Sequence, residues 1–387
     1  MDFSLSDEQR ELQQAARRFA RSELADVARQ VEETDEPLSA DWKCKLGELG
    51  FLGVNLPETH GGLGLGALEA LLVLEEFAQV SPGIAFPVFE SSVGPIMAIE
   101  RFGGEALKRR IIPKVCAGEH VVAVAMSEPE AGTALTDLTT SAREEDGEIV
   151  LNGTKRWCSG GGRSDGYLVY CRFTDEPGAK GIGAVYVDKG AAGLSFGERE
   201  RLMGFRGVPS ADIFLDDVRV PKENVVVGAG GFKKLMEAFD LERCGNATMS
   251  LGIAAGAVEK VGEYIQERRA FGKPLIDFQA VQLKLAEMTM QVEASRLLIH
   301  RAAWAAEQGF PSVLDSSMAK CFANEMVREV TGKAMQVMGG YGYSKQYDIE
   351  QRMRDGWGWG IAGGAIDVQK VNIAAAIAGR RFNQRAK

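Results

Sequence analysis

The chain has 387 residues, which is long enough for two or three domains and a large hydrophobic core. Hydrophobic residues make up 45% and charged residues 26%, as in ordinary soluble globular proteins. The formal net charge is −9 and no basic block occurs, so we do not expect nucleic acid as a partner.

The start of the chain is acidic and amphipathic and lacks the apolar segment of a signal peptide. No run of about 18 apolar residues predicts a membrane span. The six cysteines and three histidines are scattered, without a Cys-x-x-Cys pair. We therefore expect a cytoplasmic protein with reduced thiols, no metal site and no membrane partner.

Residues 1–120 have the spacing typical of helices, and we expect them to form an all-α domain. Ser6 and Gln9 are spaced as a capping box before the apolar residues of a first helix. Further helical stretches are expected at residues 42–49, 68–77 and 92–102. The glycine-rich run at residues 60–66 follows no clear strand, so it is predicted to be a loop.

At residue 121 the pattern changes to short apolar segments separated by Gly and Pro. Strands are expected at residues 121–125, 148–151, 155–158, 167–172, 184–187 and 211–214. Asn152-Gly153 lies between two of these segments and predicts a hairpin turn. Residues 121–230 are therefore expected to form a middle β domain, barrel-like or a sandwich.

Helical spacing returns over residues 231–387, in segments longer than a typical helix. Breaks are expected near residues 272–274, 309–311 and 339–342. Long helices with apolar stripes favour a four-helix bundle whose outer faces are also buried, which indicates an oligomer. The predicted fold class is therefore α+β, in the order helical, β, helical.

A charged group lies near the start of this C-terminal part, at residues 239–243. Asp240 and Glu242 are two residues apart, so on a helix their side chains face different ways. Arg243 has the chemistry to pair with either carboxylate or with an anionic ligand. The alternative, which these residues alone favour, is a solvated charged turn at the start of a helix.

Five motifs occur in order along the chain: AMSEPEAGT at 125–133, NGTKRW at 152–157, ERRAFGK at 267–273, QVMGGY at 336–341 and RMRD at 352–355. With these motifs, the chain resembles the acyl-CoA dehydrogenase family over essentially its whole length. The resemblance implies a three-domain protein that holds FAD between the β domain and the C-terminal bundle, usually as a homotetramer. It also implies an acyl-CoA substrate and an electron-transfer flavoprotein as electron acceptor.

The resemblance assigns the cofactor contacts to three groups of residues. Those implied to lie near the flavin ring and the thioester are Ser127, Thr133, Trp157 and Ser159. Those implied to reach the FAD of a neighbouring subunit are Arg268, Phe271 and Gln279. Those implied to lie over the adenosine–pyrophosphate are Gln336, Gly339 and Gly340, where glycines let backbone N–H groups approach phosphates.

The chain departs from the family where most members carry the catalytic carboxylate. Counted from Arg354-Asp355, that position is Gly363, which cannot abstract a proton. A minority of the family, including isovaleryl-CoA-type and long-chain enzymes, places the base on another helix in a Leu-Glu-Arg or Gln-Glu-Arg motif. Residues 241–243 read Leu-Glu-Arg, so the resemblance implies that Glu242 is the base.

The substrate contacts are less specific. Phe239, Asp240 and Arg243 match positions that contact the CoA chain, and the small residues around Gly363 leave space for a branched, cyclic or bulky acyl group. The tryptophans that alternate with glycines at 357 and 359 either line the acyl pocket or pack on a surface loop, and we expect Trp359 in the pocket.

Glu90 matches the far end of the acyl site, where a carboxyl group would bind a polar tail or act as a second base. The alternative, favoured by the sequence, is an exposed glutamate at a helix start.

Three functions remain open from the sequence. The first is an FAD-dependent acyl-CoA dehydrogenase that uses Glu242. The second is an enoyl-CoA reductase or a non-oxidative acyl-CoA lyase or desulfinase on the same scaffold. The third is a non-catalytic partner subunit of a hetero-oligomer, which the replacement of the usual Glu, Thr and Gln by Gly363, Ala365 and Asp367 would suggest.

Overall fold

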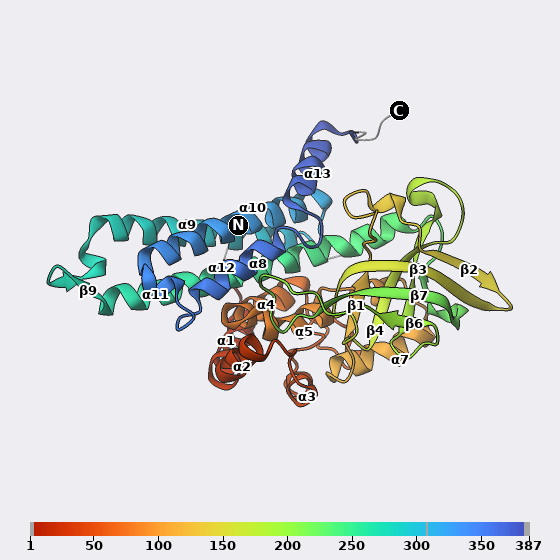
Figure 1. Ribbon diagram of the computed structural model, residues 1–387, viewed down its shortest axis with the longest axis horizontal. Coiled ribbons are helices and arrows are strands. Elements are labelled where there is room, and N and C mark those ends of the chain that lie inside the picture. The colour runs from red at the N-terminus through yellow and green to blue at the C-terminus, as the bar shows by residue number, and fades with distance from the viewer. Residues whose placement is uncertain (1–3, 307–308, 383–387) are drawn as a thin grey trace.

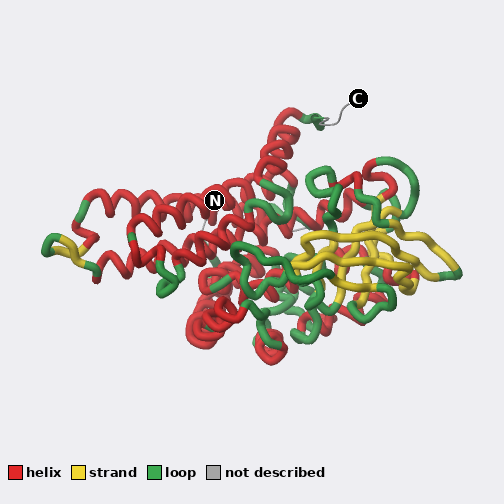
Figure 2. Tube along the Cα trace, in the orientation of Figure 1, coloured by secondary structure: helices red, strands yellow, loops and turns green. Residues whose placement is uncertain are grey.

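The computed structural model describes residues 4–306 and 309–382. Helices at the two ends of the chain flank a middle group of strands, so the predicted α+β class and its order of parts are confirmed (Figures 1 and 2). The change from helix to strand falls between Cys116 and Val122, and the change back falls between Val227 and Phe232. As domain boundaries, residues 120 and 230 stay predictions.

The N-terminal helices are α1 (Asp7–Glu23), α2 (Ala25–Thr34), α3 (Ala40–Glu48), α4 (Ala67–Val80), α5 (Pro82–Ser92), α6 (Ile96–Phe102) and α7 (Glu105–Cys116). The predicted capping box of α1 is confirmed, because the Gln9 backbone N–H donates to Ser6 Oγ (3.1 Å) and the Ser6 N–H donates to Gln9 Oε1 (2.9 Å). The helix expected at residues 92–102 is wrong in its first part, since α5 ends at Ser92 and α6 begins at Ile96.

Helix α5 was not expected from the sequence, because Pro82 and Pro87 lower the helix propensity of the segment. Pro82 is at the first helical turn, where no backbone N–H is needed. Every residue of α5 is buried, so packing outweighs the cost of the internal proline. The stretch at residues 82–102 is long and apolar enough to cross a membrane, but its most apolar 18 residues are all buried inside the protein.

The middle strands are β1 (Val122–Ala125), β2 (Ser141–Glu145), β3 (Glu148–Ser159), β4 (Gly166–Arg172), β5 (Ile182–Asp188), β6 (Leu194–Phe196), β7 (Ser210–Pro221) and β8 (Val225–Val227). They form one sheet in the order β6-β7-β3-β2-β4-β5-β8, and β1 adds to β4 in parallel. Apolar side chains of these strands, among them Tyr167, Val169 and Val185, form a second hydrophobic core in the middle part of the chain.

The hairpin expected at Asn152-Gly153 is wrong, because β3 runs unbroken through both residues. The turn lies at Asp146-Gly147, where both residues have positive φ (52° and 84°) between the paired Glu145 and Glu148. Asp-Gly in a two-residue turn suits this left-handed geometry as well as Asn-Gly does. Gly153 instead sits at an irregularity in the pairing of β3 with β7.

The C-terminal elements are α8 (Phe232–Glu267), β9 (Arg269–Ala270), β10 (Lys273–Pro274), α9 (Gln279–Trp304), α10 (Val313–Met338), α11 (Gly340–Tyr343), α12 (Ile349–Trp359) and α13 (Ile366–Ala378). Helices α8, α9 and α10 lie side by side, with α12 against α8 and α10 (Figure 1). The three predicted breaks lie between α8 and α9, between α9 and α10, and after α10. The β9–β10 hairpin forms one end of the molecule and the β1–β8 sheet lies at the other, while α13 projects from the bundle (Figure 1).

Candidate active site

The charged group at residues 239–243 lies inside α8, well after its first turn. Phe239, Asp240 and Arg243 are buried and Glu242 is half-buried, so the alternative of a solvated turn at a helix start is wrong. Helix α8 crosses from the bundle to the sheet and packs on α4 and α10 (Figure 1). The helix that carries this charged group therefore contacts the N-terminal helices, the C-terminal bundle and the sheet.

Arg243 is paired within its own helix. Its Nη1 donates to Asp240 Oδ1, which also accepts from Ser316 Oγ of α10 (2.7 Å). Burial raises the pKa of Asp240, and the charge of Arg243 and the bond from Ser316 oppose that shift. The guanidinium carbon lies 5.2 Å from the centre of the Phe239 ring. Arg243 Nε is buried without a partner among the described residues, which leaves this donor for a ligand.

Glu242 has the electrostatics of a general base. Burial raises its pKa to about 8, and the positive charges of Arg243 and Lys320 oppose that shift. A carboxyl group whose pKa lies near neutral pH is a stronger proton acceptor than an ordinary glutamate. Glu242 also raises the pKa of the Glu90 carboxyl and of the Tyr170 phenol, which places it near α5 and β4.

Gly363 lies against the same face of α8. A β-carbon on it would lie 3.3 Å from Asn246 Nδ2, 3.7 Å from Lys320 Cε and 3.8 Å from Phe239 Cζ. Asn246 follows Glu242 by one helical turn, so the two side chains share a face of α8. Gly363 has φ +63°, a conformation that side chains rarely adopt. The structure thus brings the position without a carboxylate together with the turn that carries Glu242.

The glycine-rich stretch before Gly363 is not the loop that the sequence suggested, since α12 continues to Trp359. Its glycines allow close packing: a β-carbon on Gly358 would lie 2.5 Å from the Phe205 ring. Trp359 is buried, with its ring 4.7 Å from Phe205 and 5.8 Å from Phe89, centre to centre. Trp357 is 41% exposed and stacks on Arg328, so only Trp359 faces inward.

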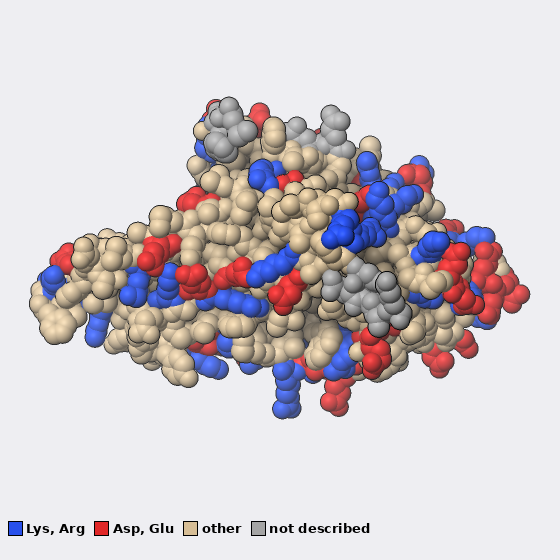
Figure 3. Space-filling view, turned by 90° about the horizontal axis from the view of Figure 1, so that it is seen from above, with Lys and Arg blue, Asp and Glu red and all other residues tan. Residues whose placement is uncertain are grey.

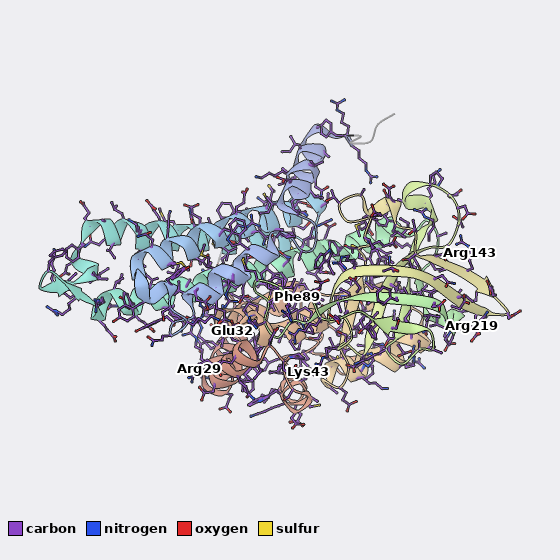
Figure 4. All side chains as sticks on the ribbon, viewed as in Figure 1. Arg29, Glu32, Lys43, Phe89, Arg143 and Arg219 are labelled. Carbon is purple, nitrogen blue, oxygen red and sulfur yellow. The ribbon has the colours of Figure 1, made fainter. Side chains whose placement is uncertain are left out.

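Glu90 is buried near the end of α5, so the alternative of an exposed glutamate at a helix start is wrong. Its neighbour Phe89 lies where the N-terminal helices approach the sheet (Figure 4). Burial raises the pKa of Glu90 well above the usual range, and the charge of Glu242 raises it further. Glu90 Oε2 and Trp359 Nε1 are buried without partners among the described residues. Glu90 is next to Phe89 in the chain and the Trp359 ring packs near it, so each of these two neighbours has a buried polar atom without such a partner.

Trp157 lies at an irregularity in the pairing of two strands of the sheet. The pairing of β3 with β7 shifts register between Lys155 and Cys158, and Trp157 has φ +60° there. Its ring is 52% exposed, with the Arg156 guanidinium carbon 4.3 Å from the ring centre. An exposed aromatic face on a rigid strand fits a planar ring such as a flavin. Ser127 and Ser159 are half-buried close by, and Thr133 is exposed.

The segment with Ser127 is held by a buried ion pair that the sequence did not suggest. Lys155 Nζ donates to Glu128 Oε1 (2.8 Å) and to the Met126 carbonyl (3.2 Å). Glu128 also accepts from the backbone N–H groups of Thr139 and Thr140. Burial disfavours the Glu128 carboxylate, but Lys155 and these donors outweigh burial and lower its pKa to about 2. The pair fixes the loop that contains Ser127, which the family resemblance implies to lie near the flavin ring.

The remaining predicted cofactor residues lie far from Trp157 in the same chain. Arg268 precedes the β9–β10 hairpin and Phe271 lies in its turn, at the opposite end of the molecule (Figure 1). Phe271 is 96% exposed, and the Arg268 guanidinium lies 5.4 Å from the Tyr341 ring. A β-carbon added to Gly339 or Gly340 would meet no atom of the described residues within 4 Å. Gln279 and Gln336 lie on the neighbouring helices α9 and α10. The space next to these two glycines is therefore open, which leaves room for a part of the cofactor that does not contact Trp157.

Family models match most of the chain: the acyl-CoA dehydrogenase N-terminal domain at residues 6–119, the middle domain at 123–218 and the C-terminal domain at 229–378. The chain is 36% identical over 380 residues to the acryloyl-CoA reductase (NADH) of Anaerotignum propionicum, covering 97% of this chain and 96% of the relative. It is 35% identical over 392 residues to the 3-sulfinopropanoyl-CoA desulfinase of Variovorax paradoxus, covering 99% and 97%.

Solved structures share the fold. Butyryl-CoA dehydrogenase from Megasphaera elsdenii is 33% identical with a TM-score of 0.94, covering 98% of this chain and 100% of that one. A chain in a structure of the electron transferring flavoprotein of Acidaminococcus fermentans is 34% identical with a TM-score of 0.94, covering 97% and 99%. PigA in complex with FAD is 26% identical with a TM-score of 0.92, covering 98% and 99%.

Lys155→Met is expected to lower the free energy of unfolding by about 3–5 kcal/mol, because it leaves a buried carboxylate without its cation. Urea unfolding of the FAD-loaded protein measures the loss. Since the folded pKa of Glu128 is lowered to about 2, its contribution is complete above the unfolded pKa of about 4.3 and is lost as the pH falls through about 2.

Lys222→Met is the matched control, because Lys222 makes an exposed pair with Glu144 at 2.7 Å. Exposed pairs contribute about 0–1 kcal/mol, so this variant should unfold almost as the wild type does. Equal, small losses in the two variants would show that the buried pair does not stabilise the loop.

Proposed function

The chain belongs to the acyl-CoA dehydrogenase family, and we propose that it introduces an α,β double bond into an acyl-CoA with Glu242 as the base. FAD is the cofactor of the family and, when bound, accepts the hydride from the β-carbon. The observation that carries the proposal is the meeting of Gly363, which has no side chain, with the α8 turn that carries Glu242. The proposed substrate has a short, branched, cyclic or otherwise shaped acyl group.

Glu242 removes the α-proton onto its carboxylate. The α-proton of a thioester is weakly acidic, so a base with a raised pKa lowers the free-energy cost of the transfer. Arg243 is held by Asp240, which also accepts a hydrogen bond from Ser316, and it keeps its Nε for the CoA chain. Phe239 packs under the same guanidinium and forms part of the wall beside Gly363. These residues orient the substrate against the base.

The far end of the proposed acyl site favours a polar or bulky group over a long straight chain. Trp359, Phe89 and Phe205 close the site with aromatic rings. Burial and the charge of Glu242 raise the pKa of Glu90 well above the usual range, which favours the protonated carboxyl group, and a protonated carboxyl group can donate a hydrogen bond. An acyl group with an oxygen at this end would satisfy the buried Glu90 or Trp359 atom that otherwise has no partner among the described residues.

A homotetramer and transfer of electrons to an electron-transfer flavoprotein complete the proposal. Leu283, Met290, Leu297 and Trp304 are exposed and seven residues apart, so they line one side of α9. The face seen from above has broad uncharged areas over the C-terminal helices, which suits burial against other subunits (Figure 3). The exposed hairpin with Phe271 would then meet the flavin of a neighbour. The similarity to a chain in an electron transferring flavoprotein structure supports the acceptor.

The relatives support a second candidate on the same scaffold. One is named as an acryloyl-CoA reductase and the other as a 3-sulfinopropanoyl-CoA desulfinase. In an enoyl-CoA reductase Glu242 would donate a proton, and in a lyase or desulfinase it would be dispensable. A third candidate, a non-catalytic subunit, has Gly363, Ala365 and Asp367 in its favour. Measured flavin content and reaction with saturated acyl-CoAs separate the three.

We expect one class of saturated acyl-CoA to bleach the visible flavin absorption of the purified protein under anaerobic conditions. The panel contains short, branched, cyclic and dicarboxylic members. Glu242→Gln should retain FAD and lose the bleaching, because the amide cannot accept the α-proton. Glu237→Gln on the same helix is the control and should be bleached as the wild type is.

Other results decide against Glu242 or against the dehydrogenase. Bleaching that persists in Glu242→Gln would remove Glu242 as the base. Bound FAD that no saturated acyl-CoA bleaches would favour the reductase or desulfinase candidate, which enoyl-CoA with NADH or a sulfinylated acyl-CoA would then test. Purified protein without flavin would favour the non-catalytic subunit.

The rate of bleaching should rise with pH and level off above about 8, because Glu242 must be ionised and its pKa is raised to about 8. Below that pH the rate should fall about tenfold for each pH unit. Stopped-flow measurements between pH 6 and 9.5 at saturating substrate test this, in steps of about half a unit. A rate that is constant through this range would contradict the raised pKa.

Glu90→Leu should reduce the preference for an acyl group with a terminal oxygen over an aliphatic group of equal size. The ratio of kcat/KM for the two should fall about tenfold or more, the usual effect of losing a buried hydrogen-bond partner. Glu90→Gln keeps a donor and should keep most of the preference. An unchanged ratio in Glu90→Leu would show that Glu90 does not contact the acyl group.

A further inference from the structure

The segment between β6 and β7 leaves the sheet and contacts helices of both ends of the chain, and we name its residues 203–207 the strap. On one side the strap is bound to α12. The Arg354 guanidinium donates through Nη1 to the Met203 carbonyl (3.1 Å), and the Phe205 backbone N–H donates to Asp355 Oδ1 (2.7 Å). Asp355 is buried, so this second bond is shielded from water. Two neighbouring residues of α12 therefore fix the backbone of the strap.

The other side of the strap is bound to the end of α2. The Gly207 N–H donates to Asp35 Oδ1 (3.0 Å), and Arg199 Nη2 donates to the same oxygen (2.7 Å). A β-carbon on Gly207 would lie 2.2 Å from Val31 Cγ1, so the strap lies directly against this helix. The strap thus joins the sheet, the N-terminal helices and the C-terminal bundle at one place.

Phe205, in the middle of the strap, has a strained backbone. Its φ is +61°, a value that bulky residues rarely adopt and glycine adopts freely. Strain of this kind persists only where the surrounding structure imposes it, and it is concentrated at functional sites. The bond to Asp355 imposes it here. Because a glycine would fit the same backbone without strain, the phenyl ring at this position needs a reason.

The ring of Phe205 packs against the ring of Trp359. The two ring centres are 4.7 Å apart and the planes are inclined at 46°. A β-carbon on Gly358 would lie 2.5 Å from Phe205 Cζ, so the missing side chain at position 358 makes room for the phenyl ring. Phe89 of α5 lies beside Trp359 as well, with the ring centres 5.8 Å apart. Two rings therefore confine the Trp359 side chain, and the strap supplies one of them.

The backbone of Trp359 is held in place from the other direction. Lys320 Nζ of α10 donates to the carbonyls of Trp359 (3.1 Å) and Ala362 (3.0 Å), and its third acceptor is Asn324 Oδ1 (2.9 Å). These bonds fix the chain from the end of α12 to the residue before Gly363. Only the Trp359 side chain is then free to rotate, and the two neighbouring rings limit that rotation.

We propose that Phe205 is a positioning residue that sets the size of the acyl group the site accepts. The strap holds its ring beside Trp359, and Trp359 closes the far end of the acyl site. Without the phenyl ring, the Trp359 side chain could turn toward the strap and open space for a longer group. The expected substrate class is therefore a compact acyl group, with a branch or a small ring. This role rests on the proposed acyl site beside Gly363, but it requires neither Glu242 as the base nor one direction of the reaction.

The test is calorimetric titration of the FAD-loaded protein with a pair of α,β-unsaturated acyl-CoAs. Such compounds already carry the double bond that a dehydrogenase introduces, so their binding is measured whether or not the proposed oxidation occurs. One member is the tightest ligand of the wild type, and the other has two more methylene groups at its far end. In Phe205→Gly the Kd of the longer ligand divided by that of the shorter should fall about tenfold or more, the usual effect of space for one or two methylene groups.

Phe205→Gly removes the ring and also relieves the backbone strain, so the strap itself should keep its shape. Phe205→Leu keeps the strain and a smaller apolar side chain, and should give an intermediate ratio. The matched control is Leu202→Gly, which removes an apolar side chain, 37% exposed, just before the strap. It should leave the ratio as in the wild type. Because each ratio compares two ligands in one protein, a general loss of folded protein cancels.

Three results would overturn the proposal. The first is an unchanged ratio in a Phe205→Gly protein that folds and holds FAD. The second is an equal change in Leu202→Gly, which would assign the effect to motion of the strap and not to the ring. The third applies if Phe205→Gly does not fold: an unchanged ratio in Phe205→Leu, or failure of both variants to fold, would assign Phe205 to the scaffold alone. A changed ratio in a protein whose flavin no saturated acyl-CoA bleaches would support the role of Phe205 and count against the dehydrogenase.

Discussion

The cost of burying charge governs the region where the helices of both ends meet the sheet. An isolated ion in a protein interior is unfavourable by several kcal/mol, so each buried charge needs a partner or changes its pKa. Lys155 with Glu128 and Arg243 with Asp240 follow the first course. Glu242 and Glu90 follow the second, since both have raised pKa values. The paired charges hold the framework, and the two carboxyl groups with raised pKa values lie where we place the substrate.

The sequence predicted features that depend on local chemistry. The capping box at Ser6 and Gln9, the order of helical and β parts and the long C-terminal helices all follow from neighbouring residues. The family motifs also directed attention to Gly363 and to the α8 turn that carries Glu242, which the structure brings together. The capping box and the order of parts were predicted correctly because each rests on residues within a few turns of one another, whereas the role of Glu242 stays a prediction.

The features that the sequence did not predict depend on long-range packing. Helix α5 contains Pro87, and only its complete burial explains why it is helical. Glu90 looked exposed because a glutamate usually is, yet α5 is covered on all sides. Lys320 is polar in a helix with many polar residues, and nothing near it in sequence shows that two of its three acceptors lie about 40 residues further on. The hairpin error differs, because Asp146-Gly147 was a local signal that Asn152-Gly153 obscured.

The distance between the two groups of cofactor residues links the proposed activity to assembly. Trp157 lies on the sheet, whereas Phe271 and Gly339 lie at the opposite end of the same chain (Figure 1). One cofactor that contacts both groups must lie between two copies of the chain. The hydrophobic residues exposed along α9 give a physical reason for such copies to associate, because their burial removes apolar surface from water. Cofactor binding and oligomerisation would then stabilise each other.

A base on α8 has a different mechanical basis from a base at position 363. Gly363 sits in a turn with φ +63°, and its position depends on the hydrogen bonds that Lys320 and Asn246 make to the backbone before it. Glu242 is carried by a helix of 36 residues that packs on α4 and α10. A side chain on a packed helix is held more tightly than one on a turn. If Glu242 is the base, as proposed, a carboxylate on α8 would free the turn to shape the acyl site, and the rigid helix would keep the base in place.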